Sequence, residues 1–315
     1  MIMRRQVEIL LAVYNGEQYI EDFLDSLLNQ SHREFHLIVS NNFSTDRTAE
    51  ILTAYASRFP GGMTILPLPD STVPAVQNFA RVSRAATANY VMYADADDVW
   101  HEGKVARSLA EILEAERQYG RHNPLLVHCD LAVVDNALVP IHPSYWAYQN
   151  IDPSRTELRQ LLLRNCVTGC TCIVNRSLME LAVPIPSAAM MHDYWLALVA
   201  AAQGHILSLR EPLIEYRQHG TNDTGAQRWG SRFVADRMWN LLGDKGPRYS
   251  LRRKILQAVA LRDRLDPVLS ESNRILLDRF CELRQQTFAQ RRLSIMRYGF
   301  WDDGLARNLG LLAAI

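Results

Sequence analysis

Three carboxylates occur within four residues, since Asp95, Asp97 and Asp98 follow the apolar segment at residues 90–94. Carboxylates this close repel one another, so a bound cation is the natural resolution of their charge. Mg²⁺ and Mn²⁺ prefer oxygen ligands, and Mg²⁺ is typically held by one or two carboxylates together with phosphates. A solvated acidic turn or a helix cap is the structural alternative. We expect a divalent metal site, with Mn or Mg as the ion.

Glycine-rich phosphate loops are absent from the sequence. It contains neither Gly-x-Gly-x-x-Gly nor Gly-x4-Gly-Lys-Ser/Thr, the two loops whose backbone cradles phosphates. A phosphate ligand would therefore be held by a metal on aspartates instead.

The segments that must position these carboxylates alternate between two patterns. Short apolar runs typical of buried strands occur at residues 7–13, 35–40, 63–66 and 90–94. Helical spacing of apolar side chains occurs between them, at residues 19–28, 49–52 after Thr45 or Asp46, and 77–86. This order predicts an α/β fold with a mostly parallel sheet flanked by helices.

Polar clusters follow three of the predicted strands, at residues 14–17, 41–46 and 95–98. In parallel sheets, ligands bind beyond the carboxyl ends of the strands. The three clusters should therefore line one pocket.

The second half of the chain continues the mixed pattern and then becomes helical. Strands are expected at residues 125–129, 169–174, 206–209 and 213–216, and a helix at 193–202. Residues 1–227 hold 17 basic and 25 acidic residues, whereas residues 228–315 hold 17 basic and 9 acidic ones. We divide the chain into a body, 1–227, and a helical basic C-terminal region, 228–315, that contacts something anionic, an acceptor or another subunit.

Composition places the chain among globular proteins, since 48% of its 315 residues are hydrophobic and 22% are charged. No apolar run reaches the ~18 residues of a membrane span, and the first residues lack the pattern of a secretion signal. The five cysteines are an odd number, and the spacing Cys166-x3-Cys170-x-Cys172 does not fit common zinc sites. We expect free thiols in a reducing cytoplasm. The sequence has no recognisable nucleic-acid-binding motif, so a nucleic-acid partner is not expected.

Three motifs in the first 100 residues resemble the family 2 glycosyltransferases of the GT-A (Rossmann-like) fold. They are Ala12-Val13-Tyr14-Asn15-Gly16-Glu17, Ser44-x-Asp46-x-Thr48, and Asp95-x-Asp97 followed by Asp98-Val-Trp100. The second half is similar to a rhamnosyltransferase-like subgroup of the same family. Its residues are Asn165-Cys-Val-Thr168-Gly169, His192-Asp193-Tyr-Trp195 and Tyr216-Arg217-Gln-His219-Gly-Thr-Asn222.

The resemblance implies roles for individual residues. The residues that would bind the nucleotide-sugar are Ala12, Val13, Tyr14, Glu17, Asn41, Asp95 and Ala96. The DXD aspartates Asp95 and Asp97, with His219, would hold the metal and the diphosphate. Asp193 stands where such enzymes carry the catalytic base, and we place Gly169 and Trp195 on the acceptor side.

One departure concerns the base of the nucleotide. The family usually has two aspartates where this chain has Asn41-Asn42, and the first accepts the N3–H of uracil or thymine. An amide oxygen can still accept that bond, but more weakly than a carboxylate. Base selectivity is therefore looser here, or the donor base differs.

The chemistry implied by the resemblance is an inverting transfer of a hexose, with rhamnose from a dTDP or UDP donor as the first choice. The acceptor would be a saccharide or a lipid-linked saccharide, in polysaccharide or lipopolysaccharide assembly. The acceptor hydroxyl must lose a proton as it attacks, which a carboxylate such as Asp193 can accept. Read without the resemblance, Asp193 is a helix N-terminal residue and His219 a loop histidine.

Other interpretations remain open from the sequence. Glucose or galactose could be the sugar, since sugar choice depends on few contacts. Asp95-x-Asp97-x-Val99 also fits the nucleophile motif of haloacid-dehalogenase-type phosphatases, although that class needs a later lysine and the next after Lys104 is Lys245. A non-catalytic sugar-nucleotide binder is the third alternative.

The basic tail carries a separate hypothesis. Residues 291–301 mix Arg291, Arg292 and Arg297 with Tyr298 and Trp301, a composition that suits a membrane interface. We expect a cytoplasmic protein with a hypothetical peripheral contact at the inner face of the membrane. Packing of this segment on the body is the alternative.

Overall fold

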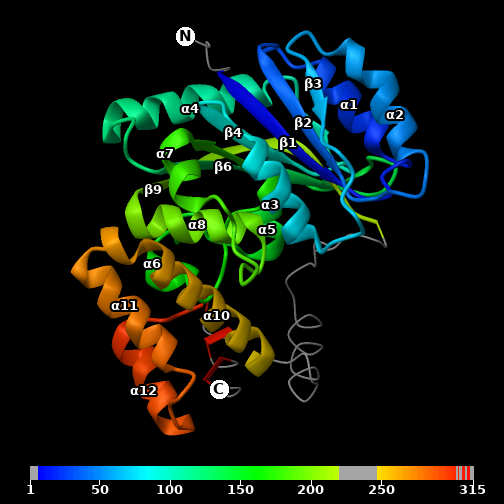
Figure 1. Cartoon of the computed structure of the whole chain (residues 1–315). Helices are drawn as coiled ribbons and strands as arrows, with labels where there is room; N and C mark the ends of the chain where they lie inside the picture. The colour runs from blue at the N-terminus through cyan, green and yellow to red at the C-terminus, as the bar shows by residue number, and fades with distance from the viewer. Residues whose placement is uncertain (1–5, 220–246, 303, 305–306, 309–310, 313–315) are drawn as a thin grey trace.

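The computed structural model describes residues 6–219 and 247–302, together with residues 304, 307–308 and 311–312. One nine-stranded sheet forms its centre, in the order β3-β2-β1-β4-β8-β6-β9-β5, with β7 beside β6. Figure 1 shows helices on both sides of this sheet and a helical layer beyond it.

The first half of the sheet is parallel, as the sequence predicts. Its strands are β1 (Val7–Val13), β2 (Phe35–Asn41), β3 (Met63–Ile65) and β4 (Tyr90–Ala94). Val13 lies beside Asn41, and Leu11 lies beside Ala94. The carboxyl ends of β1, β2 and β4 therefore share one edge, which brings the three polar clusters together.

The second half makes the sheet mixed, because β8 (Cys172–Asn175) runs antiparallel to both β4 and β6 (Leu125–Val134). Beyond β6 the sheet continues with β9 (His205–Arg217), β5 (Val99–Trp100) and β7 (Pro140–His142). Only the β6–β9 pair in this half is parallel among the described strands.

Three expected strands differ from the observed ones. Residues 169–171 form a 3-10 turn, η2, instead of a strand, because the backbone N–H and hydroxyl of Thr171 both donate to the Thr168 carbonyl. The expected strands 206–209 and 213–216 are one strand, β9. Its pairing with Cys129 and Asp130 jumps from Leu209 to Pro212, so residues 210 and 211 bulge out of the ladder.

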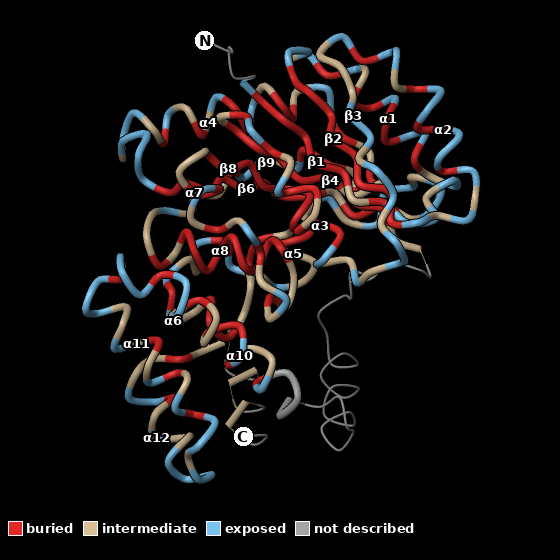
Figure 2. The backbone as a smooth tube through the Cα atoms, in the orientation of Figure 1, coloured by how far each residue is buried: buried red, intermediate tan, exposed pale blue. Residues whose placement is uncertain are grey.

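Two hydrophobic clusters lie on the two faces of the sheet, and Figure 2 shows its central strands as buried. On one face lie α1 (Ile20–Leu28), α2 (Thr48–Tyr55) and α4 (Lys104–Tyr119), whose buried side chains form one hydrophobic cluster with Ile9 and Leu11 of β1. On the other lie α3 (Ala75–Ala85), α7 (Arg176–Ala182) and α8 (His192–Gln203), around Leu10. The short helices are α5 (Tyr145–Gln149) and α6 (Leu158–Leu161). Alternate residues of β1 thus face opposite helical layers.

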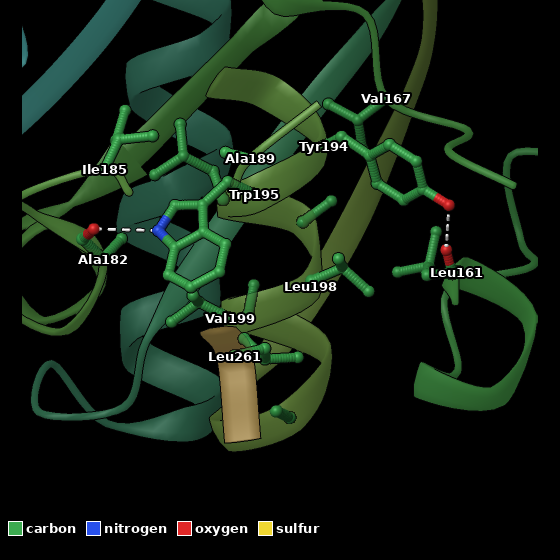
Figure 3. Close-up of a cluster of buried hydrophobic side chains, with 14 of the residues drawn as sticks. Leu161, Val167, Ala182, Ile185, Ala189, Tyr194, Trp195, Leu198, Val199 and Leu261 are labelled. Carbon is green, nitrogen blue, oxygen red and sulfur yellow. Dashed lines mark hydrogen bonds between the residues drawn. The ribbon is translucent and has the colours of Figure 1, made fainter. Parts of the chain in front are cut away.

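Three helices follow the body: α10 (Pro247–Leu265), α11 (Glu271–Glu282) and α12 (Phe288–Tyr298). The helix α10 shares a core with α8, where Leu261 lies near Trp195 (Figure 3). Gln257, which is buried, accepts a hydrogen bond from the Met190 N–H at 2.7 Å. The expected division at residue 227 lies outside the described residues. Among the described residues, no helix is both long and apolar enough to cross a membrane.

Candidate active site

Hydrogen bonds from backbone N–H groups to side chains join the loops after β1 and β2 at the edge of the sheet. Asn15 N–H donates to Ser44 Oγ, Gly16 N–H to Thr48 Oγ1, and Glu17 N–H to Asp46 Oδ2, at 2.8–3.0 Å. In return the Arg47 N–H donates to Glu17 Oε2. Two of the sequence motifs are therefore parts of one rigid rim, with Tyr14 about half exposed on it.

Asn41 and Asn42 perform different tasks in this rim. Asn42 binds both the N–H and the carbonyl of Val73, and so holds the segment that precedes α3. Asn41 is buried at the end of β2, and its Oδ1 accepts the Ser44 N–H at 3.0 Å. A second lone pair on this oxygen can still accept a bond from a ligand.

Asp97 and His219 meet at the end of β4, although 122 residues separate them in the chain. His219 Nε2 lies 2.9 Å from Asp97 Oδ2, and the imidazole stacks on Tyr19 at 4.8 Å between ring centroids. The strand β9 ends at Arg217, two residues before His219. The structure thus brings the last part of the body to the acidic cluster, as expected from the sequence.

Arg217 supports the contact between Asp97 and His219 through its hydrogen bonds. It was not recognised as a site residue from the sequence. It is 3% exposed, and its guanidinium donates to the carbonyls of Asp97 and Asn136 and to the carboxylate of Asp22. The guanidinium also lies 4.6 Å from the centroid of the Tyr19 ring. Arg217 thereby fixes the backbone at Asp97, and His219 contacts the carboxylate of the same residue.

Asp98 is the buried member of the acidic cluster. Its Oδ1 accepts the Arg217 N–H at 3.3 Å, whereas its buried Oδ2 has no hydrogen-bond partner among the described residues. Its pKa is raised well above the usual value, first by burial and then by the negative charges of Asp97 and Asp95. Burial and these neighbouring charges therefore favour the neutral form of Asp98.

The donor atoms fit a hard divalent cation. Ligand atoms of Asp95, Asp98 and Cys170 lie within 4.8 Å of one another, and Asp97 with His219 offers a carboxylate and an imidazole. Burial and the charges of Asp98 and Asp95 raise the pKa of the Cys170 thiol, and thiolate sulfur is a soft ligand that suits zinc or copper better than Mn²⁺ or Mg²⁺. Carboxylate oxygens, with one imidazole, are suited to Mn²⁺ or Mg²⁺.

Asp193 lies at the N-terminus of α8 in a separate buried position. Its Oδ1 accepts the Tyr194 N–H at 2.7 Å, and its Oδ2 accepts a hydrogen bond from Asn165 Nδ2 at 3.2 Å. Burial raises its pKa to about 7, although these hydrogen bonds act in the opposite direction. A carboxylate with this pKa can take up a proton near neutral pH.

The 3-10 turn η2 links the two acidic positions. A Cβ on Gly169 would lie 3.7 Å from Asp193 Cβ and 2.6 Å from His192 Nε2. The next residue, Cys170, contacts Asp98 and lies beside Asp95. One turn therefore has Asp193 on one side and the acidic cluster on the other.

Trp195 is a correction to the expected acceptor side. It is fully buried, and its Nε1 donates to the Ala182 carbonyl inside the core (Figure 3). It therefore stabilises α8 and cannot contact an acceptor. Gly169 is also buried, but it adjoins Asp193 directly.

Asn165 was given no role from the sequence, and Asp98 was counted only as one of three neighbouring carboxylates. Their type and position in the motifs were visible, but their partners are set by tertiary contacts across 28 and 119 residues.

Comparison with known proteins gives a family match and several similar sequences. The model of the family described as glycosyl transferase family 2 matches residues 8–177. The chain is 24% identical to the dTDP-rhamnosyl transferase RfbG of Shigella flexneri over 229 residues, which cover 69% of this chain and 74% of the relative. It is 26% identical to TuaG of Bacillus subtilis (strain 168), whose name assigns it to teichuronic acid biosynthesis; 71% of this chain and 82% of the relative are covered.

Among solved structures, the fold is similar to that of the mannosyltransferase PcManGT from Pyrobaculum calidifontis in complex with GDP-Man and Mn²⁺. The TM-score is 0.57 at 16% identity, and the match covers 99% of this chain and 79% of the other. The similarity confirms the expected GT-A-like architecture.

Proposed function

Because the chain belongs to glycosyl transferase family 2, we propose that it transfers a hexose, with inversion, from a nucleoside diphosphate onto a saccharide acceptor. The proposed donor is dTDP-rhamnose or UDP-rhamnose, and the name of the relative RfbG supports the first of these. The proposed setting is polysaccharide assembly, which the name of TuaG supports. Membership in this family excludes the phosphatase alternative.

The observation that carries the proposal is the position of η2 between two acidic sites. A glycosyl transfer needs one site that holds a diphosphate and another that takes a proton from the attacking hydroxyl. Asp95 and Asp97 supply the first, and Asp193 supplies the second, with residues 169 and 170 between them.

The donor half of the site consists of the ends of β1, β2 and β4. The nucleoside would lie on Ala12, Val13 and Tyr14, with Glu17 at the ribose and the Asn41 amide at the base. Asp95, Asp97 and His219 would hold a divalent ion, which when bound neutralises charge on the diphosphate. Ala96 lies beside Gly16, because a Cβ added to Gly16 would be 3.6 Å from the Ala96 Cβ. A bulky side chain in place of Ala96 would therefore narrow the donor site.

The acceptor half depends on Asp193. The carboxylate would accept the proton of the acceptor hydroxyl while that oxygen attacks the anomeric carbon from the face opposite the diphosphate. Asn165 donates to Asp193 Oδ2 and so orients the carboxylate. Attack from that face inverts the anomeric centre.

Release of nucleoside diphosphate tests the proposal. We would incubate the protein with dTDP-rhamnose, UDP-glucose or UDP-galactose, Mn²⁺ and simple aryl glycosides as acceptors, and compare wild type with Asp193→Asn. We expect turnover of one donor, an inverted linkage by NMR, and a rate that falls at least about 100-fold in the variant. Tight donor binding without turnover of any donor would favour the non-catalytic binder.

A further inference from the structure

The outer surface of α12 belongs to the C-terminal region, and the proposed transferase site does not use it. This helix lies at the end of the molecule away from the sheet (Figure 1). Ile295 is its one fully buried residue among those described, so α12 presents most of its circumference to solvent.

Apolar side chains are concentrated on one half of this helix. Phe288, Leu293 and Met296 are 47%, 61% and 52% exposed. Since each residue of an α-helix advances by about 100°, these three share one half of the circumference with Arg292 and Arg297. We call these five residues the α12 face. Single exposed apolar residues are ordinary, but three on one helix face are not explained by packing.

Arginines flank the α12 face, and the segment that contains it has no acidic residue. Residues 283–301 contain Arg284, Arg291, Arg292 and Arg297 and no Asp, Glu or Lys. None of these four arginines forms an ion pair with another described residue. The nearby acidic residues of α11 are already paired, because Glu282 binds Arg279 and Asp278 binds Arg262.

The arginine and aromatic side chains are arranged so that the apolar residues point outward. The Arg292 guanidinium lies 3.5 Å from the centroid of the Phe288 ring, and its Nε donates to the Leu312 carbonyl. In contrast, Phe300 is buried and Tyr298 and Trp301 pack against the core. The aromatic residues that the sequence places at a membrane therefore face inward, and Phe288, Leu293 and Met296 take that position instead.

We propose that the α12 face docks the protein on an anionic lipid bilayer, with its apolar side chains in the interface and its arginines among the headgroups. Interfacial helices combine these two features, an apolar face and flanking basic residues. The charge of the face selects an anionic surface over a neutral one. This inference is independent of the proposed transfer reaction, because docking is measured without turnover.

Co-sedimentation with vesicles tests the proposal. The full chain would be mixed with vesicles of phosphatidylcholine alone, or with about a third phosphatidylglycerol, at low and high salt. We expect binding to the anionic vesicles only, with partitioning that falls about fivefold per lost arginine in Arg292→Gln and Arg297→Gln. The double variant Leu293→Gln/Met296→Gln should bind at least about tenfold more weakly.

Leu68→Gln is the matched control, since Leu68 is 57% exposed but lies on the loop between β3 and α3. It should bind vesicles as the wild type does, and thermal melts should show that all variants are folded. Equal binding to neutral vesicles, no binding, or binding unchanged in the Leu293→Gln/Met296→Gln variant would overturn the proposal. So would self-association that the same double variant abolishes, because the face would then belong to a second copy of the chain.

Discussion

Asp193 combines burial with hydrogen-bond donors on both carboxylate oxygens, from Tyr194 and Asn165. Burial favours the neutral acid, and the donors hold its orientation without restoring its ordinary acidity. The result is a carboxyl that changes charge near neutral pH, where a general base is most effective.

The first prediction concerns the pH dependence of activity. The pKa of Asp193 is raised to about 7, and only the ionised form can take a proton from the acceptor. The kcat/KM should therefore rise with pH and level off above pH 7. In Asp193→Asn this rise should disappear along with most of the rate. A wild-type profile that is flat between pH 5 and pH 8 would rule out Asp193 as the base.

The second prediction concerns stability. The folded protein keeps the Asp193 proton up to about pH 7, whereas the unfolded chain loses it near the ordinary value of 3.8. Stability from this group is thus present below pH 4 and is lost as pH rises to 7, at about 1.4 kcal/mol per pH unit. Urea unfolding should show that the free energy of unfolding of Asp193→Asn, minus that of wild type, increases from pH 4 to pH 7. Above pH 7 this difference should be constant. A difference independent of pH would contradict this.

The sequence identified candidate site residues by their chemical type, but it did not show which residues they contact. The DXD aspartates are recognisable by their position after an apolar run, and the structure brings Asp97 to His219 as expected. Arg217 was not recognised, because a buried arginine is visible only when its three acceptors from distant segments are known. Trp195 had the type of a sugar-stacking residue, and only its burial shows that it belongs to the core.

At the scale of elements, the N-terminus of α8 is held by packing around His192. Its ring stacks on Phe79 of α3 at 3.7 Å between centroids and lies 4.8 Å from Tyr93. Burial lowers the pKa of His192 to about 3, so the ring is neutral. Because Gly169 leaves space for this ring, η2 and α8 approach closely enough to place Asp193.

Gly169→Ala is the third prediction. The added Cβ would lie 2.6 Å from His192 Nε2, so the ring and α8 must shift. We expect a loss of about 1–3 kcal/mol in stability and a fall of about 10–100-fold in kcat. Gly103→Ala is the control, since its Cβ would meet only Arg107 Cγ at 3.8 Å, and it should leave kcat unchanged. Equal effects of the two substitutions on kcat would show that the space at Gly169 does not position Asp193.

The parallel strands β1, β2 and β4 could be predicted because they are continuous apolar runs that end in polar clusters. The strand β9 was divided in two because Arg210, Glu211 and Pro212 interrupt its apolar pattern. Arg210 and Glu211 form the bulge, and Glu211 pairs with Arg107 of α4. The pattern of β8 did not reveal its direction, since an antiparallel strand with both faces buried has the same composition as a parallel one.

At the scale of the whole molecule, the body and the described C-terminal helices share one hydrophobic cluster that includes Trp195, Ile255, Leu261 and Phe280. The helices α10 and α11 therefore stabilise α8, which carries Asp193. The charge difference between the two parts of the sequence was visible beforehand, but this shared core was not, because apolar periodicity does not say against which element a helix packs.

The fourth prediction tests this coupling. Gln257→Met removes the acceptor of the Met190 N–H and leaves that group without its partner, which should cost about 1–3 kcal/mol of unfolding free energy. The adjacent variant Leu256→Met is the control, because Leu256 is 41% exposed and its replacement should change stability by less than about 0.5 kcal/mol. Urea unfolding compares them. Equal stabilities would show that α10 does not support the segment before α8.

The most direct test of the central claim is calorimetric binding of UDP, dTDP and GDP, each with and without Mn²⁺, to wild type and Asp97→Asn. The substitution keeps the size of the side chain but removes the charge beside His219. We expect Mn²⁺-dependent binding of a pyrimidine nucleoside diphosphate that is lost in the variant. Absence of binding by any of the three nucleotides in Mn²⁺, or equal affinity in wild type and Asp97→Asn, would contradict it.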